Sequence, residues 1–411
     1  MRRILIIGAG QAGMQLGLCL QAAGYEVTIM SARTPEEMRG GRITSTQCLF
    51  GPSLAIERDH GLNRWEHETP RIMEMNVSVA APPDQAPPGT KALGFAPAFE
   101  GQSVDQRVKM AGWLELFESR GGNVVYHGVM TSDLEGLAEL YDLTLIAAGK
   151  GELVELFDRD PERSPYDRPM RQLAAMYMHG MTWPPGVDTH QVRINVVPGV
   201  GELFYLPGYT TSGACDIWLW EALPGGAMDV WGDKPSPEAF IKRSTELCRE
   251  YIPWEADAAH AAVPTDPRCT LYGGYVPMVR KPVGSLSATA HVFGMGDVVV
   301  LNDPIAGQGA NNAAHCAEIY LRHILEHGNR PFDPAWMQET FDAYWDYARH
   351  STHFSNMLLG PPPEHFLQVL GVAAEDPRVA QRFADGYTHP EDFDRWILHP
   401  DKTADYLASL T

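Results

Sequence analysis

The chain has 411 residues, of which 44% are hydrophobic and 20% charged, as is ordinary for a folded globular protein with two or three subdomains. Its formal net charge of −20 argues against nucleic-acid and anionic-membrane partners, because both select for basic surfaces. The first apolar run is too short for a signal sequence and no run reaches membrane-spanning length, so we expect a cytoplasmic protein. The six cysteines are scattered without a C-x-x-C pair, which predicts reduced thiols and neither a metal site nor a disulfide framework.

The first thirty residues predict a β-α-β unit that binds a dinucleotide. A strand over 3–7 leads into Gly8-Ala9-Gly10-Gln11-Ala12-Gly13, a helix follows over 14–23, and a second strand covers 26–30. Free N–H groups at the helix start, near Gln11 and Ala12, would hold the phosphates with the help of the helix dipole. The plainer alternative is a tight turn in an ordinary α/β domain.

The three glycines of this motif have separate tasks. Gly8 makes the tight turn, Gly10 lets a pyrophosphate approach the backbone, and Gly13 lets helix and strand pack closely. The carboxylate expected about 20 residues further on, which would bind the ribose, is missing. Ser31 and Arg33 stand there instead, so one of them must make that contact.

Beyond residue 30 the pattern of predicted elements changes twice, first to mainly antiparallel strands and then to helices. Apolar periodicity predicts helices over 53–60, 104–121, 236–251 and 312–326, and strands over 71–79, 124–126, 143–149, 191–197, 202–207, 215–222 and 290–297. We therefore expect an α/β chain whose nucleotide-binding domain is discontinuous and takes 1–75, 103–165 and 265–330. A mainly antiparallel β-sheet substrate domain would take 76–102 and 166–264, and a helical C-terminal region 331–411.

Three short stretches admit more than one interpretation. The turn Arg39-Gly40-Gly41-Arg42 suits a loop around a charged ligand and a solvated basic turn equally well. Trp218 and Trp220 alternate, so both face one side of a strand, and core filling is favoured over a pocket wall. The histidines of His350-Ser351-Thr352-His353 fall on a predicted helix, where a surface position is favoured over a metal pair.

A second glycine-rich segment follows far along the chain. Gly296-Asp297 ends a strand, Asp303-Pro304 comes next, and Gly307-Gln308-Gly309-Ala310-Asn311 opens a long helix. Asp297 can accept a hydrogen bond from a ribityl hydroxyl. N–H groups at the helix start can face the N1–C2=O edge of an isoalloxazine, which becomes negative on reduction.

These residues resemble the second FAD signature of flavoprotein monooxygenases of the p-hydroxybenzoate hydroxylase fold. The resemblance implies a Rossmann-like FAD-binding domain with an inserted substrate domain. Its cofactor residues would be Gly8, Gly10, Gln11, Ala12, Gly13, Ser31, Arg33, Asp297, Pro304, Gly307, Gly309, Ala310 and Asn311.

Within that fold the chain resembles the two-component styrene and indole monooxygenases over nearly its whole length. The matching residues are Gly8 to Gly13, Arg33-Thr34-Pro35, Arg42, Thr46, Val104-Asp105-Gln106-Arg107, Ser164-Pro165 and Asp303-Pro304 through Asn311. The resemblance implies that Arg42 and Arg107 also bind FAD. It implies further that reduced FAD and O2 form a C4a-hydroperoxyflavin, which epoxidises an electron-rich double bond. Thr46 would orient water or the peroxide, and its plainer role is that of a loop hydroxyl capping a backbone group.

One departure from single-component hydroxylases bears on the source of electrons. Those enzymes carry an Asp-Gly pair after the strand that here ends at Ala147-Ala148, whereas this chain has Gly149-Lys150-Gly151. A second G-x-G-x-x-G for a nicotinamide nucleotide is also missing. The resemblance therefore implies that FAD arrives already reduced by a transient partner, an NAD(P)H-dependent flavin reductase. It leaves a homodimer open.

The loop Ser45-Thr46-Gln47-Cys48-Leu49 separates the two branches of the family. The indole branch resembles this chain at Ser45 and Gln47 and carries an aliphatic residue where Ile72 stands; Leu49 and Met75 depart slightly from its pattern. We therefore expect Ser45, Thr46 and Gln47 at the reacting end, a pocket with Leu49, Ile72 and Met75, and a small aromatic substrate. Indole, attacked at its C2=C3 bond, is favoured over styrene.

Other flavoprotein functions were weighed against this one. A single-component aromatic hydroxylase and a flavin-dependent halogenase share the fold, and Trp218-Leu219-Trp220 is similar to the tryptophan motif of halogenases. Here, however, Pro224 is one residue out of step with that motif. An FAD-dependent saturating reductase lacks support in the pocket loops, and a non-enzymatic flavin sensor is the plainest alternative.

Overall fold

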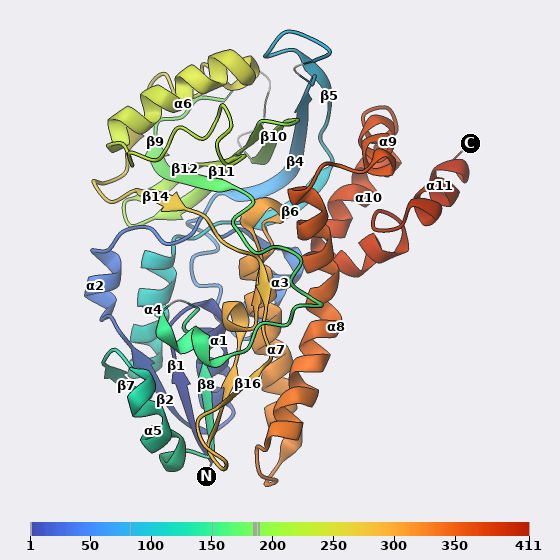
Figure 1. The fold of residues 1–411 in the computed structure, drawn as a ribbon. Helices are drawn as coiled ribbons and strands as arrows, with labels where there is room; N and C mark the ends of the chain where they lie inside the picture. Colours follow the sequence, from blue (N-terminus) through green and yellow to red (C-terminus); the bar gives the residue numbers. More distant parts are fainter. Residues whose placement is uncertain (1, 83, 150, 184–186, 188–189, 411) are drawn as a thin grey trace.

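The structure is a computed structural model that describes residues 2–82, 84–149, 151–183, 187 and 190–410. It contains two large β-sheets, one above the other in Figure 1, with helices around the lower sheet, one helix above the upper sheet and a helical C-terminal segment along one side. This is a mixed α/β fold.

The lower sheet has six strands in the order β16-β17-β8-β1-β2-β7. Their bounds are β1 (Arg3–Ile7), β2 (Glu26–Ser31), β7 (Asn123–Tyr126), β8 (Leu143–Ile146), β16 (Val283–Ser285) and β17 (His291–Gly294). All neighbours are parallel except β16 and β17. Helices α1 (Gln11–Ala22), α4 (Gln106–Ser119), α5 (Leu134–Leu140) and α7 (Gly309–His327) surround this sheet. The continuous apolar runs of β1 and β8 are buried on both faces, as parallel strands require.

The upper sheet has ten strands and is mainly antiparallel, apart from the parallel pair β4 and β10. Its path is β13-β9-β12-β11-β10-β4-β6-β3, with β14 beside β9 and β5 beside β4. The bounds are β3 (Leu49–Phe50), β4 (Arg71–Ala80), β5 (Lys91–Phe95), β6 (Ala98–Gln102), β9 (Gln172–His179), β10 (Gln191–Val197), β11 (Gly201–Thr210), β12 (Gly213–Ala222), β13 (Val263–Pro264) and β14 (Thr270–Gly273). A separate pair, β15 (Met278–Val279) and β18 (Val300–Leu301), is antiparallel.

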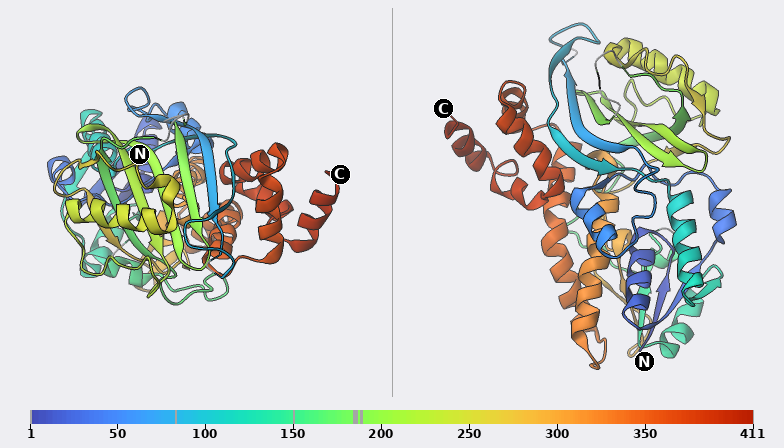
Figure 2. Two further views of the ribbon diagram at one scale, coloured as in Figure 1. Left: turned by 90° about the horizontal axis from the view of Figure 1, so that it is seen from above. Right: turned by 180° about the vertical axis from the view of Figure 1, so that it is seen from behind.

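Helix α6 (Pro237–Tyr251) lies across the outer face of the upper sheet (Figure 2). Trp218 and Trp220 of β12 face this helix, are fully buried, and meet Trp231, which stacks on Phe240 of α6. Core filling is thus confirmed for both tryptophans.

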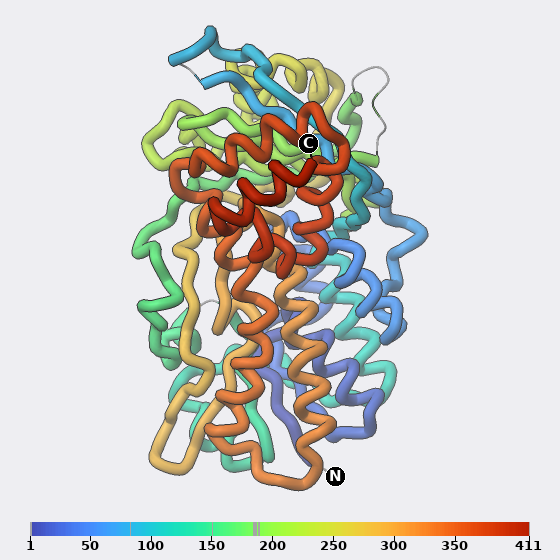
Figure 3. The backbone as a smooth tube through the Cα atoms, turned by 90° about the vertical axis from the view of Figure 1, so that its right-hand side faces the viewer, coloured from blue at the N-terminus to red at the C-terminus, as the bar shows by residue number. Residues whose placement is uncertain are grey.

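The C-terminal helices are α8 (Pro334–Leu359), α9 (Glu364–Ala373), α10 (Pro377–Thr388) and α11 (Pro400–Ala408). Helix α8 runs along the molecule (Figure 3); its first half packs in the core of the lower sheet and its second half, through Phe354 and Leu359, in that of the upper sheet. His350 of this helix is buried between the two halves, so its predicted surface position is wrong, whereas His353 is exposed. The 3.6-residue period turns His350 toward the core.

Most predicted elements exist, with shifted ends. The strand over 191–197 is confirmed residue for residue, whereas α1 begins three residues and α7 three residues earlier than predicted, because both glycine motifs already adopt helical geometry. Helices α2 (Pro35–Arg39) and α3 (Gly51–Asp59) complete the fold. The domain boundaries stay a prediction; strand β4 runs across the one at residue 75. None of the helices in the described ranges has the length and apolar character needed to span a bilayer.

Candidate active site

A cavity of about 580 Å³ lies between the two sheets. Its lower wall is built from the carboxyl ends of β1, β8 and β17 and from the starts of α1 and α7. Its upper wall comes from side chains on one face of β10, β11 and β12, namely Val192, Ile194, Phe204, Leu206 and Leu219. A small chamber of about 90 Å³ adjoins it beside Ser45, Tyr275 and Pro304. Ligands of open α/β sheets bind at this carboxyl edge.

The first glycine motif forms one end of the cavity. Gly8 has φ +119°, and a Cβ on it would lie 2.6 Å from the carbonyl carbon of Ala147, so only glycine fits this turn. A Cβ on Gly13 would lie 2.4 Å from the Gly8 oxygen; Gly13 therefore packs helix on strand and does not line the cavity. Gly10, Gln11 and Ala12 line it, and no side chain in the described ranges caps the start of α1. This helix end is open to an anion.

The second glycine motif lines the same cavity. Asp303 caps a short turn, Pro304–Ala306, after which Gly307 adopts φ +63° and α7 begins at Gly309. The lining here comprises Asp297, Pro304, Ile305, Ala306, Gly307, Gly309 and Ala310. The start of α7 likewise has no side-chain cap within the described residues. Two uncapped helix starts therefore point at one cavity.

The Asn311 side chain forms hydrogen bonds with the backbone of the loop that contains Cys48 and Phe50. Its amide nitrogen donates to the carbonyls of Cys48 and Gly307, both at 3.0 Å, and its amide oxygen accepts from the Phe50 N–H at 2.9 Å. It is absent from the cavity lining of the described residues. Its side chain instead ties the loop that carries Thr46 to the second glycine motif.

At the ribose position, Ser31 and Arg33 both line the cavity. The Ser31 hydroxyl donates to the Arg33 carbonyl at 2.6 Å and accepts from the Arg33 N–H at 3.3 Å. Because that hydroxyl is engaged within the turn, Arg33 is the better placed of the two to meet an adenosine ribose or phosphate. Lys150 of the predicted Gly149-Lys150-Gly151 turn lies outside the described residues.

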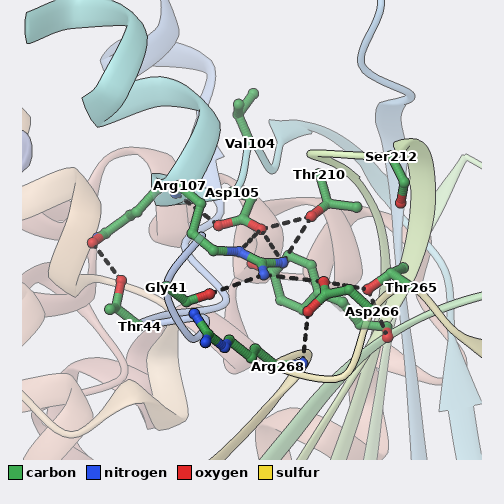
Figure 4. A network of polar contacts seen from close by, with 12 residues as sticks. Gly41, Thr44, Val104, Asp105, Arg107, Thr210, Ser212, Thr265, Asp266 and Arg268 are labelled. Carbon is green, nitrogen blue, oxygen red and sulfur yellow. Dashed lines mark hydrogen bonds and ion pairs between the residues drawn. The ribbon is translucent and has the colours of Figure 1, made fainter. Parts of the chain in front are cut away.

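Arg107 is the centre of a buried polar network (Figure 4). Its guanidinium donates from Nε to Asp105 Oδ2 at 2.8 Å, from Nη2 to Thr210 Oγ1 at 3.1 Å and from Nη1 to the Gly41 carbonyl at 3.3 Å. It also forms ion pairs with Asp105, from Nη2 at 2.8 Å, and with Asp266, from Nη1 at 3.0 Å, so that every nitrogen of the guanidinium has a partner. Arg107 lines the cavity, but its role in the structure is to join α4 to the Gly41 turn and the upper sheet; FAD binding by it stays a prediction.

Three further predicted residues do not line the cavity. Arg42 donates to the carbonyl and hydroxyl of Thr270 at 3.2 and 3.1 Å, so it anchors its turn to β14. Leu49 points away because its neighbours Cys48 and Phe50 both line the cavity and strand side chains alternate. Ile72 is fully buried where β4 pairs with β6. These three positions follow from tertiary pairing that the loop sequence does not reveal, and the roles predicted for the three residues stay predictions.

The opposite end of the cavity is mostly apolar. Ser45, Thr46, Gln47 and Met75 line it as predicted, together with Phe99 and the upper-sheet side chains. Those upper-sheet residues are absent from the predicted site, although the alternation within 191–197 and 202–207 indicates that they share one face of the sheet. Gln47 donates through Nε2 to the Val104 carbonyl, while its Oε1 is buried without a donor in the described part of the chain.

The cavity fits FAD on several grounds. Two uncapped helix starts are suited to the pyrophosphate and to the pyrimidine edge of the flavin, and Asp297 also belongs to the lining. The Asn302 amide also lines the cavity and is buried, with neither its nitrogen nor its oxygen partnered within the described residues. Such a group calls for a bound partner.

Solved flavoproteins share this fold. The flavin-dependent brominase Bmp2 is 14% identical over 96% of this chain and 97% of its own, with a TM-score of 0.64. A flavoprotein/dehydrogenase from Cytophaga hutchinsonii is 13% identical over 96% and 94%, with a TM-score of 0.66. A halogenase PltM mutant in complex with FAD is 13% identical over 100% and 95%, with a TM-score of 0.64. At such identities the likeness shows the fold alone, and it confirms the predicted p-hydroxybenzoate hydroxylase type.

The fold and the site define an FAD-dependent flavoprotein. Styrene monooxygenase StyA of Pseudomonas fluorescens is 30% identical over 402 residues, which cover 95% of this chain and 94% of that protein. StyA of a further Pseudomonas species is 29% identical over 95% and 94%. Residues 149–258 match the family model of the styrene monooxygenase A putative substrate binding domain. The chain belongs to the styrene monooxygenase family, as its motifs predicted.

Proposed function

We propose that this protein is the oxygenase component of a two-component system that epoxidises indole at its C2=C3 bond and, more slowly, styrene-like alkenes. The observation that carries the indole assignment is the buried Gln47 Oε1, which has no donor within the described residues and belongs to a residue of the mostly apolar wall. An indole N–H can supply that donor, and the vinyl group of styrene cannot.

The protein residues bind, orient and exclude water. Reduced FAD, when bound, supplies the oxygen-activating chemistry. The open starts of α1 and α7 hold negative charge at the phosphates and at the flavin edge. The upper-sheet side chains keep the reacting end dry, and Thr46 is placed in the wall to orient a water or a polar oxygen there.

We expect the protein to bind reduced FAD several-fold more tightly than oxidised FAD. The uncapped start of α7 favours the negative charge that reduction places on the flavin edge, while no carboxylate binds the ribose near Ser31. Anaerobic titration with each form measures both dissociation constants. Tighter binding of oxidised FAD would contradict the expectation.

We also expect no turnover with NADH or NADPH alone. The Asp-Gly pair that serves NAD(P)H binding in single-component hydroxylases is replaced by Gly149-Lys150-Gly151. Adding an unrelated NADH-dependent flavin reductase should restore oxygen consumption and product formation from indole and styrene. Product-coupled oxidation of NAD(P)H by the protein alone would favour a single-component hydroxylase, and chloride-dependent products would favour a halogenase.

A further inference from the structure

Four ionisable side chains are buried together next to the cavity-lining loop Pro304–Gly307, hereafter the cofactor loop. Glu202 of β11 and Glu221 of β12 lie opposite each other in the sheet register, two residues along from the cavity-lining pair Phe204 and Leu219 and on the same face. Arg171, just before β9, and Asp303, just before the Pro304–Ala306 turn, complete the group. The group therefore lies where the upper sheet meets the second glycine motif.

Arg171, the cation of this group, has a hydrogen-bond acceptor for each of its donors. Arg171 donates to Glu202 at 2.8 and 3.0 Å and to the carbonyls of Met170, Leu359 and Leu358 at 3.0, 3.2 and 3.3 Å. All five of its donors are engaged. It neutralises Glu202 but offers no hydrogen bond to the other two carboxyls.

Glu221 and Asp303 are left with each other. Both are 0% exposed, and their carboxyl groups lie in hydrogen-bonding contact. Neither oxygen of Glu221, nor Oδ2 of Asp303, accepts from a donor in the described ranges; Oδ1 of Asp303 accepts from the Ile305 N–H at 3.1 Å. Two buried carboxylates in contact that share a single backbone donor do not both stay ionised, so one proton lies between them.

We propose that Glu221 and Asp303, hereafter the acid pair, share one proton, and that this protonated pair positions the cofactor loop Pro304–Gly307 so that its proton occupancy controls the binding of reduced FAD. Glu221 donates to Asp303, and Asp303 in turn holds the N–H of Ile305. Loss of the proton to solvent at high pH breaks this link and adds a second negative charge beside the loop. Both effects weaken the binding of a flavin that is itself negative.

The electrostatics of the group agree with this assignment. Burial raises the pKa of Glu221 well above its usual range, and the neighbouring charges of Asp303 and Glu202 raise it further against the opposing Arg171. Burial also raises the pKa of Asp303 to about 6, opposed by its hydrogen bond from the Ile305 N–H. The larger upward shift of pKa belongs to Glu221, so Glu221 holds the shared proton. The inference requires FAD as cofactor but not any particular alkene substrate.

Anaerobic titration of reduced FAD between pH 6 and pH 9 tests the proposal. Glu221→Gln keeps a neutral donor toward Asp303 and cannot ionise. The wild-type dissociation constant should rise with pH by roughly fivefold more than that of the variant, the size expected for one added charge in a partly screened site. The flavin's own ionisation is common to both proteins and cancels in this comparison. Coinciding pH profiles would overturn the proposal.

Two further variants keep the test decisive. Asp216→Asn removes a carboxyl on the opposite face of the same strand, whose pKa burial raises to about 7, and should retain the wild-type profile. Asp303→Asn keeps the cap on the Ile305 N–H but removes the charge. It should flatten the pH profile of reduced-FAD binding as Glu221→Gln does, so it decides the question if Glu221→Gln does not fold. Loss of the pH dependence in Asp216→Asn would show a general effect of buried acids and sink the idea.

The stability of the apoprotein gives a second measurement, which does not depend on flavin. Because the Glu221 pKa is raised in the folded state, its contribution to stability is present below the unfolded value near 4.5 and is lost as pH rises toward the folded value. The melting temperature of Glu221→Gln relative to wild type should therefore increase steadily with pH above about 5 in the apoprotein. A difference that does not change with pH would contradict the shared proton.

Discussion

Replacing Arg107 with Met is expected to lower the free energy of unfolding by about 3–5 kcal/mol, the cost of leaving a buried charge without its partner. Arg107 is 4% exposed and Asp105 0%. Without the guanidinium, Asp105 keeps only its hydrogen bonds from the Arg107 N–H and the Thr210 hydroxyl, and the Gly41 turn loses its tie to α4. Urea unfolding of the apoprotein measures the change apart from any loss of FAD.

Arg39→Met is the matched control. Arg39 makes a similarly forked ion pair, with Glu115 at 2.5 Å, but the two side chains are 42% and 49% exposed. Its removal should cost at most about 1 kcal/mol. Adding Asp105→Asn to Arg107→Met should recover part of the loss, because asparagine is neutral and caps α4 equally well. Equal losses for the two arginines would show that the network around Arg107 contributes no more than a surface pair.

The lower sheet and its glycine motifs could be predicted from the sequence because their signals are local. A strand, a glycine turn and a helix follow one another within 3–22, and the spacing of the three glycines between strand and helix can be recognised without knowledge of the remaining chain. The predicted start of α1 is three residues too late because Gln11 and Ala12 belong both to the glycine motif and to the helix. Local rules thus locate such an element better than they fix its ends.

The cavity walls were less predictable because they depend on pairing between distant strands. Leu49 and Ile72 were assigned to the pocket from the branch pattern of the family, yet the pairing of β3 and β4 with β6 removes both from the lining. Conversely, Phe204 and Leu219 are partners in the antiparallel pairing of β11 and β12. Their side chains therefore lie on the same face of the sheet, the face that lines the cavity. The sequence shows alternation along a strand but not which face meets the cofactor.

The acid pair illustrates the same limit. Glu221 and Asp303 are far apart in sequence, and each alone resembles an ordinary surface carboxylate of an acidic protein. Their contact, and the saturation of Arg171 by other acceptors, exist only in the folded chain. No spacing rule connects a β12 residue with the residue before a proline turn, so this feature could not be inferred before the structure.

The last expected result concerns the choice of substrate, and it is measured best with two bicyclic molecules of one shape. Indene has the outline of indole and the same kind of double bond, but carbon replaces the N–H. If Gln47 Oε1 accepts from the indole N–H, Gln47→Val should lower the indole-to-indene ratio of kcat/KM by roughly tenfold, which corresponds to about 1.4 kcal/mol for one net hydrogen bond. Loss of the Gln47 bond to the Val104 carbonyl loosens the loop for both substrates alike and cancels in the ratio.

Ser45→Ala controls for the loop, because it removes the hydroxyl that accepts from the Gln47 N–H at 3.0 Å and leaves the Gln47 side-chain amide in place, so its indole-to-indene ratio should match wild type. A ratio that Gln47→Val leaves unchanged would show that the amide serves only the loop, and the preference for indole would then have no support in the geometry of the site.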